Sequence, residues 1–410
     1  MAYLRLQEAP LDEVARIDEP GFYLGDVKPV YERLRDEAPV WWYERGGVWV
    51  ISRYDDIRTI ERDPILFSAA RGAFLGEIPY APPVGSPAPK HRWTTDPPHH
   101  TAYRALFAGL FTSEASAQRR AVIDRVVADA VDAVSASEKI DFTDSIAIPV
   151  TVNMIAAVLG VPRSDWQDFK RWSDAYVEIF DVGLSGERRT QVKTEIRQLK
   201  DYFADLLTFR RDNPVDDVVS AIAQARIDGQ PLPLEAQIET CRSLLVAGNE
   251  TTRNTLSAGM IALAQHPDTW TSIRQDRTII PNATEEILRY TSVLLHFIKS
   301  ASRDTQLGGM RIKRGDFVVL LYASGNFDAT AFPQPEIFDV QRAFARPQLA
   351  FGYGPHHCLG SALAREEIAS VLRALAQRYR GWELAGPVRR RPSTLVDSYD
   401  HVPIAFTPER

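Results

Sequence analysis

The chain has 410 residues, 45% of them hydrophobic and 25% charged, so it can bury a large core without a metal or disulfide framework. Its formal net charge of -6, with no long Lys/Arg run, argues against general nucleic-acid binding. The start lacks a signal-peptide pattern and no apolar stretch is long enough for a membrane span, which predicts a cytoplasmic protein. No linker-like stretch interrupts the chain, so we predict one domain over residues 1–410.

The N-terminal part combines short regular elements with a long loop. Residues 29–37 read as a short helix, and Val40–Tyr43 and Val48–Ile51 as the two strands of a hairpin. Between residues 68 and 99 the many Pro and Gly residues forbid regular helix and predict a long loop. Long ordered loops are often functional.

Helices are expected to dominate the middle of the chain, from about residue 102 to 274. Apolar residues recur at helical spacing in residues 121–134 and 192–209. The longest helix should follow Pro233 and run to Gln265, about 33 residues or roughly 50 Å. A helix of that length would cross the whole protein.

The C-terminal part is predicted to mix elements. We expect a helix around residues 285–290 and strands near residues 318–322, followed by an irregular run that ends at His357. A last amphipathic helix should cover residues 359–375.

The sequence has two cysteines, Cys241 and Cys358, with no Cys-x-x-Cys spacing, so neither a disulfide framework nor a structural zinc site is indicated. Cys358 follows two glycines and precedes an apolar helix. Glycines let backbone approach a flat ligand, and amide N–H groups near a helix N-terminus stabilise a thiolate. A thiolate is the ligand with which haem iron cleaves O–O bonds. The alternative, a structural buried cysteine, is common for a lone cysteine but does not explain the surrounding ten residues.

Residues 351–360, Phe-Gly-Tyr-Gly-Pro-His-His-Cys-Leu-Gly, resemble the haem-binding signature of the cytochrome P450 monooxygenases at every fixed position. Further landmarks of that family appear in order from about Val40 to Phe406. The resemblance implies a mostly α cytochrome P450 fold, a helical triangular prism with a smaller β-containing region. It also implies haem b between the long helix and the cysteine loop, with Cys358 as the axial ligand of the iron. The other residues of this loop that it places around the haem are Phe351, Gly352, His356 and Gly360.

Glu250 and Thr251 lie near the middle of the long helix, after Gly248. A glycine and two β-branched residues weaken the helical ladder and predict a local opening, where a hydroxyl and a carboxylate could relay protons. The resemblance implies that Thr251 is the alcohol that stabilises dioxygen and that Glu250 is the acid coupled to bulk protons. The alternative is a kinked helix in which the threonine bonds back to the preceding turn.

Glu286 and Arg289 share one helix face, a spacing that by itself indicates only a surface ion pair. The resemblance implies that Arg342 joins them in a buried network that holds the cysteine loop in shape.

His100 and Arg104 lie four apart on one helix face and together suit a carboxylate. The resemblance implies that they and His356 bind the haem propionates; the alternative is a capped surface helix. Lys299 stands where the family usually has arginine, and because lysine is a point charge without a bidentate fork, its part in propionate binding stays open.

The substrate pocket should be apolar, as most small-molecule sites are. Its candidate residues are Phe74, Leu75, Val246, Ala247, Leu295, Phe297 and Val396. For each of them, the alternative is a position in the hydrophobic core. No fixed charge lies among them, so we expect a hydrophobic or amphipathic substrate. The run from Ala247 to Asn254 resembles bacterial members that act on steroids, terpenoids and branched lipids.

The resemblance implies insertion of one oxygen atom from dioxygen into the substrate. No flavin or nicotinamide fingerprint is present, so we predict a separate ferredoxin and ferredoxin reductase as electron donors. The arginines that could form a basic face for an acidic ferredoxin are Arg104, Arg119, Arg120 and Arg125. Two alternatives are a peroxide-driven oxygenase and a non-catalytic haem sensor; the Glu250–Thr251 pair argues against both.

Overall fold

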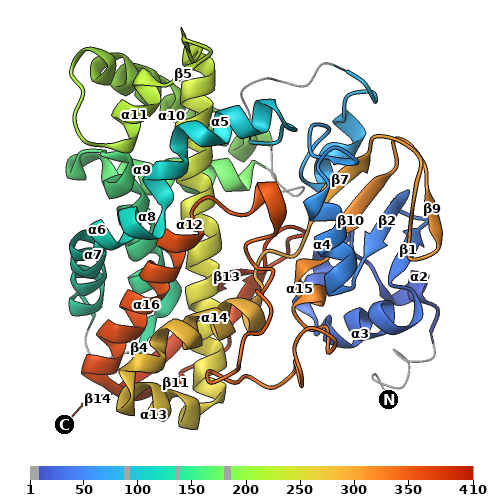
Figure 1. Ribbon diagram of the computed structural model, residues 1–410. Helices are drawn as coiled ribbons and strands as arrows, with labels where there is room; N and C mark the ends of the chain where they lie inside the picture. Colours follow the sequence, from blue (N-terminus) through green and yellow to red (C-terminus); the bar gives the residue numbers. More distant parts are fainter. Residues whose placement is uncertain (1–8, 87–92, 135–138, 180–185, 410) are drawn as a thin grey trace.

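The computed structural model describes residues 9–86, 93–134, 139–179 and 186–409. Figure 1 shows a large helical part beside a smaller part that contains most of the N-terminal strands. Helix α12 (Leu234–Gln265) runs through the helical part from one end to the other. The mostly helical architecture predicted from the sequence is therefore confirmed.

The other main helices surround α12 or cover the sheet. They are α3 (Lys28–Glu37), α4 (Tyr54–Arg62), α5 (His99–Ala108), α7 (Arg120–Asp132), α8 (Ile148–Leu159), α9 (Trp166–Glu178), α10 (Gly186–Asp212), α11 (Val218–Gln224), α13 (Pro267–Gln275), α14 (Ile280–Thr291) and α16 (Ser361–Arg378).

The largest sheet has five strands in the order β1-β2-β10-β7-β3. These strands are β1 (Val40–Tyr43), β2 (Val48–Ile51), β10 (Phe317–Leu320), β7 (Phe297–Ala301) and β3 (Phe67–Ser68). Strand β10 pairs with β2 in parallel and with β7 antiparallel, which joins the N-terminal hairpin to the chain that follows α14.

The remaining strands form small sheets. A three-stranded sheet combines β11 (Tyr379–Leu384), β14 (Pro403–Pro408) and β4 (Lys139–Asp141). The two-stranded ribbons are β12 (Arg389–Arg391) with β13 (Ser398–His401), β5 (Arg226–Ile227) with β6 (Gln230–Pro231), and β8 (Thr305–Leu307) with β9 (Met310–Ile312).

Several predicted elements occur where expected. The hairpin pairs Val40 with Ile51, and α3, α12 and α14 cover the predicted helical ranges. Helix α16 begins at Ser361, two residues after the predicted start. Two expectations need correction. The Pro-rich loop contains a 3-10 helix, η2 (Leu75–Tyr80), because a single short turn tolerates Pro79, and residues 87–92 of that loop lie outside the described residues. Tyr322 does not end a strand but begins the short helix α15 (Tyr322–Gly325).

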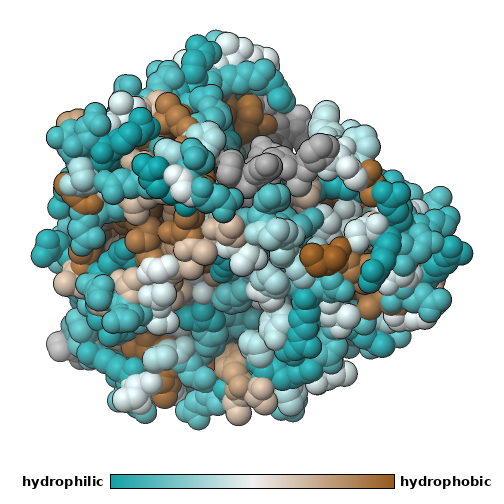
Figure 2. All heavy atoms as spheres, turned by 45° about the horizontal axis from the view of Figure 1, so that its top comes forward, coloured by the Kyte–Doolittle hydropathy of each residue, from teal (hydrophilic) through white to brown (hydrophobic). Residues whose placement is uncertain are grey.

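One large apolar cluster unites the helices around α12, and two smaller clusters lie on either side of the five-stranded sheet. Between Asn249 and Leu263, α12 is buried on most of its circumference, as expected for a helix that other elements surround. The face shown in Figure 2 is largely hydrophilic, with apolar side chains in limited patches. None of the helices in the described ranges is long and apolar enough to cross a bilayer.

A buried charge network connects α14 to the irregular chain after α15. Both carboxylate oxygens of Glu286 accept hydrogen bonds from the Arg289 guanidinium, each at 2.7 Å, and Oε2 also accepts from Arg342 Nε at 3.1 Å. The backbone N–H of Asp339 donates to Oε1 at 2.9 Å. The other N–H groups of both arginines donate hydrogen bonds to backbone carbonyls between Asn326 and Ile337. The geometry expected for these three residues is thus present.

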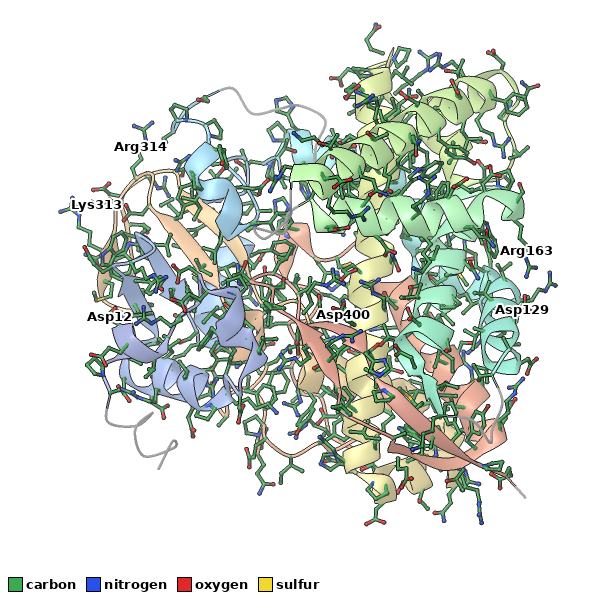
Figure 3. All side chains as sticks on the ribbon, turned by 180° about the vertical axis from the view of Figure 1, so that it is seen from behind. Asp12, Asp129, Arg163, Lys313, Arg314 and Asp400 are labelled. Atoms are coloured by element: carbon green, nitrogen blue, oxygen red, sulfur yellow. The ribbon has the colours of Figure 1, made fainter. Side chains whose placement is uncertain are left out.

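We predict that Glu286→Gln lowers the free energy of unfolding by about 3–5 kcal/mol, because it leaves two buried guanidinium groups without their counter-charge. Denaturant unfolding followed by circular dichroism measures this loss. The control is Asp129→Asn, which breaks the exposed 2.9 Å pair with Arg163 labelled in Figure 3 and should cost less than about 1 kcal/mol. Equal losses in the two variants would show that the Glu286 network does not stabilise the fold.

Candidate active site

The cysteine loop, residues 351–360, packs on the end of α4. Gly352 and Gly354 have φ values of +66° and +68°, in the left-handed region that favours glycine. A Cβ atom on Gly354 would lie 2.3 Å from the carbonyl oxygen of Glu61, so only glycine fits there. The loop closes where Cys358 N–H donates to Phe351 O at 2.9 Å, and α16 begins three residues later.

The Cys358 side chain is exposed, yet the protein surrounds it closely enough for burial to raise the pKa of its thiol. The Gly360 N–H and the charges of Arg104 and Arg365 oppose that rise. The thiol is therefore accessible although protein atoms surround it closely. Cys241, in contrast, is fully buried in the core, where burial raises its pKa more strongly.

The middle of α12 lies beside this loop in Figure 1, and α16 packs against α12. Ala247 is exposed although its helix crosses the interior, and Thr251, one turn further on, is half-buried. The expected opening of the helix is absent: α12 is continuous, and Thr251 Oγ1 donates to Ala247 O at 2.9 Å. The hydroxyl bonds to the preceding turn, and the helix is not interrupted there.

Glu250 is 5% exposed and is held by neighbouring polar groups. Arg253 pairs with Oε2, while Asn254 Nδ2 and Ser398 Oγ donate to Oε1 at 3.0 and 3.3 Å. Arg253 also lies 3.5 Å from Asp174 on α9, which is partly exposed. A chain of charges therefore leads from the buried carboxylate to the surface of the protein.

Four basic side chains from three separate parts of the sequence converge next to the loop. The rings of His100 and His356 lie 4.0 Å apart, and the charges of Arg104 and Lys299 act on both. Burial, with these charges, lowers the pKa of His100 to about 4 and that of His356 to about 2. Both imidazoles are thus neutral at pH 7, and the positive charge of the cluster comes from Arg104 and Lys299.

This cluster fits a buried anionic group. His356 Nε2 is buried and has no hydrogen-bond partner among the described residues, so it is available to one. A flat ligand with carboxylates at its edge would find glycine backbone and a thiol on one side and these donors at its rim. The residues present therefore fit a haem.

Only some of the residues predicted to line the substrate pocket lie close together or have accessible surface. The rings of Phe74 and Phe297 lie 5.6 Å apart, whereas Leu295 packs in the apolar cluster of the sheet, with Leu75 against it. Val396 packs in a separate small cluster. Val246 and Ala247 are on α12 with accessible surface, so these two and the phenylalanines are the better-placed candidates.

Comparison with known proteins agrees with this geometry. The family model described as Cytochrome P450 matches residues 86–392. The chain belongs to the cytochrome P450 family. It is 31% identical to linalool 8-monooxygenase of Pseudomonas putida, over 96% of this chain and 99% of that protein. It is 30% identical to steroid C26-monooxygenase of Mycobacterium tuberculosis, over 98% and 99%.

Solved P450 structures share the fold over nearly the whole chain. CYP108D1 from Novosphingobium aromaticivorans has a TM-score of 0.85 at 29% identity and covers 97% of this chain and 99% of its own. CYP109E1 from Bacillus megaterium, in complex with corticosterone, has a TM-score of 0.81 at 30% identity, covering 92% and 98%. The predicted P450 fold is confirmed, and the protein is a P450 monooxygenase, an enzyme class that implies haem, dioxygen, a small-molecule substrate and redox partners.

Sequence reasoning missed several polar residues of this P450 site. Arg253 and Ser398 bind Glu250, and Glu61 with Tyr322 lies behind the cysteine loop. The spacing of three residues between Glu250 and Arg253 could have predicted their ion pair, because residues three apart share a helix face. Nothing local to Glu61 or Ser398 indicates their positions, because they depend on tertiary contacts.

Next to Phe297, His296 gives a pH-dependent prediction. It is 1% exposed, its Nδ1 atom has no partner among the described residues, and burial lowers its pKa to about 4. The unfolded chain takes up this proton near the ordinary pKa of 6.5. Acidification from about pH 6.5 to 4 therefore favours unfolding, by up to about 1.4 kcal/mol per pH unit from this residue.

Urea unfolding between pH 4.5 and 7.5 measures the effect. His296→Leu should flatten the loss of stability on acidification, whereas replacement of the exposed His99 by Asn should leave it as in the wild type. An identical pH slope in His296→Leu and the wild type would contradict the prediction.

Proposed function

We propose that this P450 holds haem b through the Cys358 thiolate and uses dioxygen to oxidise a hydrophobic small molecule. The observation that supports this most strongly is the accessible thiol at depth, framed by two left-handed glycines and a cluster of anion-binding side chains. When bound, the thiolate-ligated haem supplies the oxygen-activating chemistry.

The basic cluster orients the haem. Arg104 and Lys299 supply positive charge to the propionates, and the neutral imidazoles of His100 and His356 serve as hydrogen-bond donors. Phe351, Gly352 and Gly360 shape the backbone surface next to the thiol. Lysine in place of arginine gives a single charged donor rather than a bidentate fork.

Proton delivery is assigned to α12. Thr251 Oγ1 is the donor that faces the reacting site, and the adjacent Glu250 carboxyl carries protons to its neighbourhood. Arg253 does not release a proton but keeps the carboxylate in place, with Asp174 beyond it toward solvent. The Glu250–Thr251 pair also distinguishes an oxygenase from a haem carrier, which needs no such relay.

The substrate is proposed to be terpenoid- or steroid-like. Phe74, Phe297, Val246 and Ala247 offer apolar surface, and the relatives named above are a linalool and a steroid monooxygenase. A titration of the ferric protein with terpenes, steroids and fatty acids, followed by the haem spin state, tests this class. A response confined to charged ligands would contradict it.

The electron donor is proposed to be a ferredoxin with its reductase. Two of the four arginines expected to form the docking face are engaged elsewhere: Arg104 belongs to the basic cluster, and Arg119 donates to Leu110 O at 2.6 Å. Arg125 is exposed, and Arg120 pairs with Glu366 at 3.3 Å. A smaller face around Arg120 and Arg125 remains for an acidic partner.

Cys358→Ser tests the haem assignment. We expect loss of the thiolate-type carbon monoxide spectrum, because a hydroxyl does not provide the same anionic sulfur ligand. Cys241→Ser is the matched control, since this cysteine is buried in the apolar core, and it should keep the spectrum. A thiolate-type spectrum that survives in Cys358→Ser would overturn the proposal.

Thr251→Ala tests the relay. We expect dioxygen-driven product formation to fall by about 100-fold, a typical contribution of one acid-base group, with haem content unchanged. Thr255→Ala, one turn along α12, removes an equivalent hydroxyl that bonds to Thr251 O at 2.9 Å and should change the rate little. The measurement is product formation by mass spectrometry at matched haem concentration. An unaltered dioxygen-driven rate in Thr251→Ala would overturn the assignment of Thr251 to proton delivery.

A further inference from the structure

A buried carboxylate lies behind the basic cluster. Glu61, at the end of α4, is 3% exposed, and its Oε1 atom accepts a hydrogen bond from the hydroxyl of the buried Tyr322. Its Oε2 atom is also buried and has no hydrogen-bond partner among the described residues. The Lys299 ammonium lies 3.9 Å from Oε2, within ion-pair range but too far for a hydrogen bond.

Packing fixes the position of this carboxylate relative to the cysteine loop. The Glu61 carbonyl lies where a side chain on Gly354 would be, and the Tyr322 hydroxyl is 3.7 Å from the Cβ position of Gly352. Both partners of the Glu61–Tyr322 hydrogen bond therefore touch a glycine of the loop. The carboxylate has little freedom to move away from Lys299.

The charge of Lys299 needs a partner at this depth. Its side chain is 7% exposed, and the described residues offer its ammonium no hydrogen bond. A buried ammonium without a counter-charge is costly, and Glu61 is the acidic group within ion-pair distance of it. In this ion pair, Glu61 Oε2 accepts no hydrogen bond and the Lys299 ammonium donates none among the described residues, so both can still bind a further group.

We propose that Glu61 acts on the haem through Lys299: its carboxylate pairs with the Lys299 ammonium and offsets part of the charge that this ammonium presents to the propionates. This inference rests on the proposed haem site. With haem bound, Lys299 is shared between Glu61 and a propionate. The negative charge of Glu61 then weakens the attraction between Lys299 and the propionate and disfavours the addition of an electron to the haem.

Glu61→Gln is the direct test, because glutamine keeps the shape and the acceptor for Tyr322 but removes the charge. We expect a more positive midpoint potential of the haem and release of haem to apomyoglobin that is at least about threefold slower. Glu114→Gln changes the net charge equally at an exposed carboxylate of α6 (Ser113–Gln118) and should alter neither quantity.

Lys299→Met removes the positive charge instead. We expect it to make the midpoint potential of the haem more negative and to speed up haem release. In the double variant, the shift caused by Glu61→Gln should shrink, since it acts through Lys299. If the wild type shows a thiolate-type carbon monoxide spectrum but Glu61→Gln leaves both readouts unchanged, the inference is wrong and the haem proposal stands. If Glu61→Gln does not fold, an unchanged potential in Lys299→Met overturns the inference.

Discussion

The buried carboxylate of Glu286 gathers the chain that leads to the cysteine loop. The chain from Asn326 to Leu349 is mostly irregular, so it lacks a ladder of its own to hold it. Arg289 and Arg342, paired to Glu286, instead donate to the backbone carbonyls of this segment. Since the cysteine loop and α16 come later in the same stretch of chain, we propose that this network helps to place the Cys358 thiol relative to α12.

Three of the buried carboxylates, those of Glu286, Glu250 and Glu61, differ in how many of their oxygens have a hydrogen-bond or ion-pair partner. Both oxygens of Glu286 are occupied, and those of Glu250 are also partnered but reach partly exposed Asp174 through Arg253. Glu61 keeps one oxygen without a hydrogen bond. A saturated network fixes one arrangement, whereas a buried polar atom without a partner is costly and calls for an explanation in function. Glu286 and Glu250 thus differ in whether their network reaches the surface, and Glu61 differs from both in its unpartnered oxygen.

Local pattern predicted the elements whose signals are contiguous in sequence. Residue spacing and turn residues were enough to predict three of these elements. They are the hairpin that begins with Val40–Tyr43, the long helix that ends at Gln265, and the cysteine loop. The three-stranded sheet was not predicted, since β4 pairs with β14, which lies far along the chain. Helix α12 was expected to open at Thr251, but it is continuous there, and the Thr251 hydroxyl donates to Ala247 O.

The same limit applies to the candidate site. Cys358, His100 and Arg104 stand in motifs. Glu61 and Tyr322, in contrast, are remote in sequence and meet through the packing of α4 against α15. Leu295 and Val396, selected by their place in the sequence, pack in apolar clusters. Sequence neighbours alternate between faces of a strand, so a chain position near the haem does not tell which way a side chain points.

The back-bonded Thr251 hydroxyl is compatible with a part in proton delivery. A hydroxyl has one donor and two lone pairs, so donation to Ala247 O leaves it able to accept from a nearby water or acid. To donate toward the site it must give up a hydrogen bond worth about 1 kcal/mol, a small cost beside the contribution of an acid-base group. In the proposed relay, the Ala247 carbonyl would hold the hydroxyl in a resting orientation, and a ligand that accepts its proton more strongly would turn it toward the site.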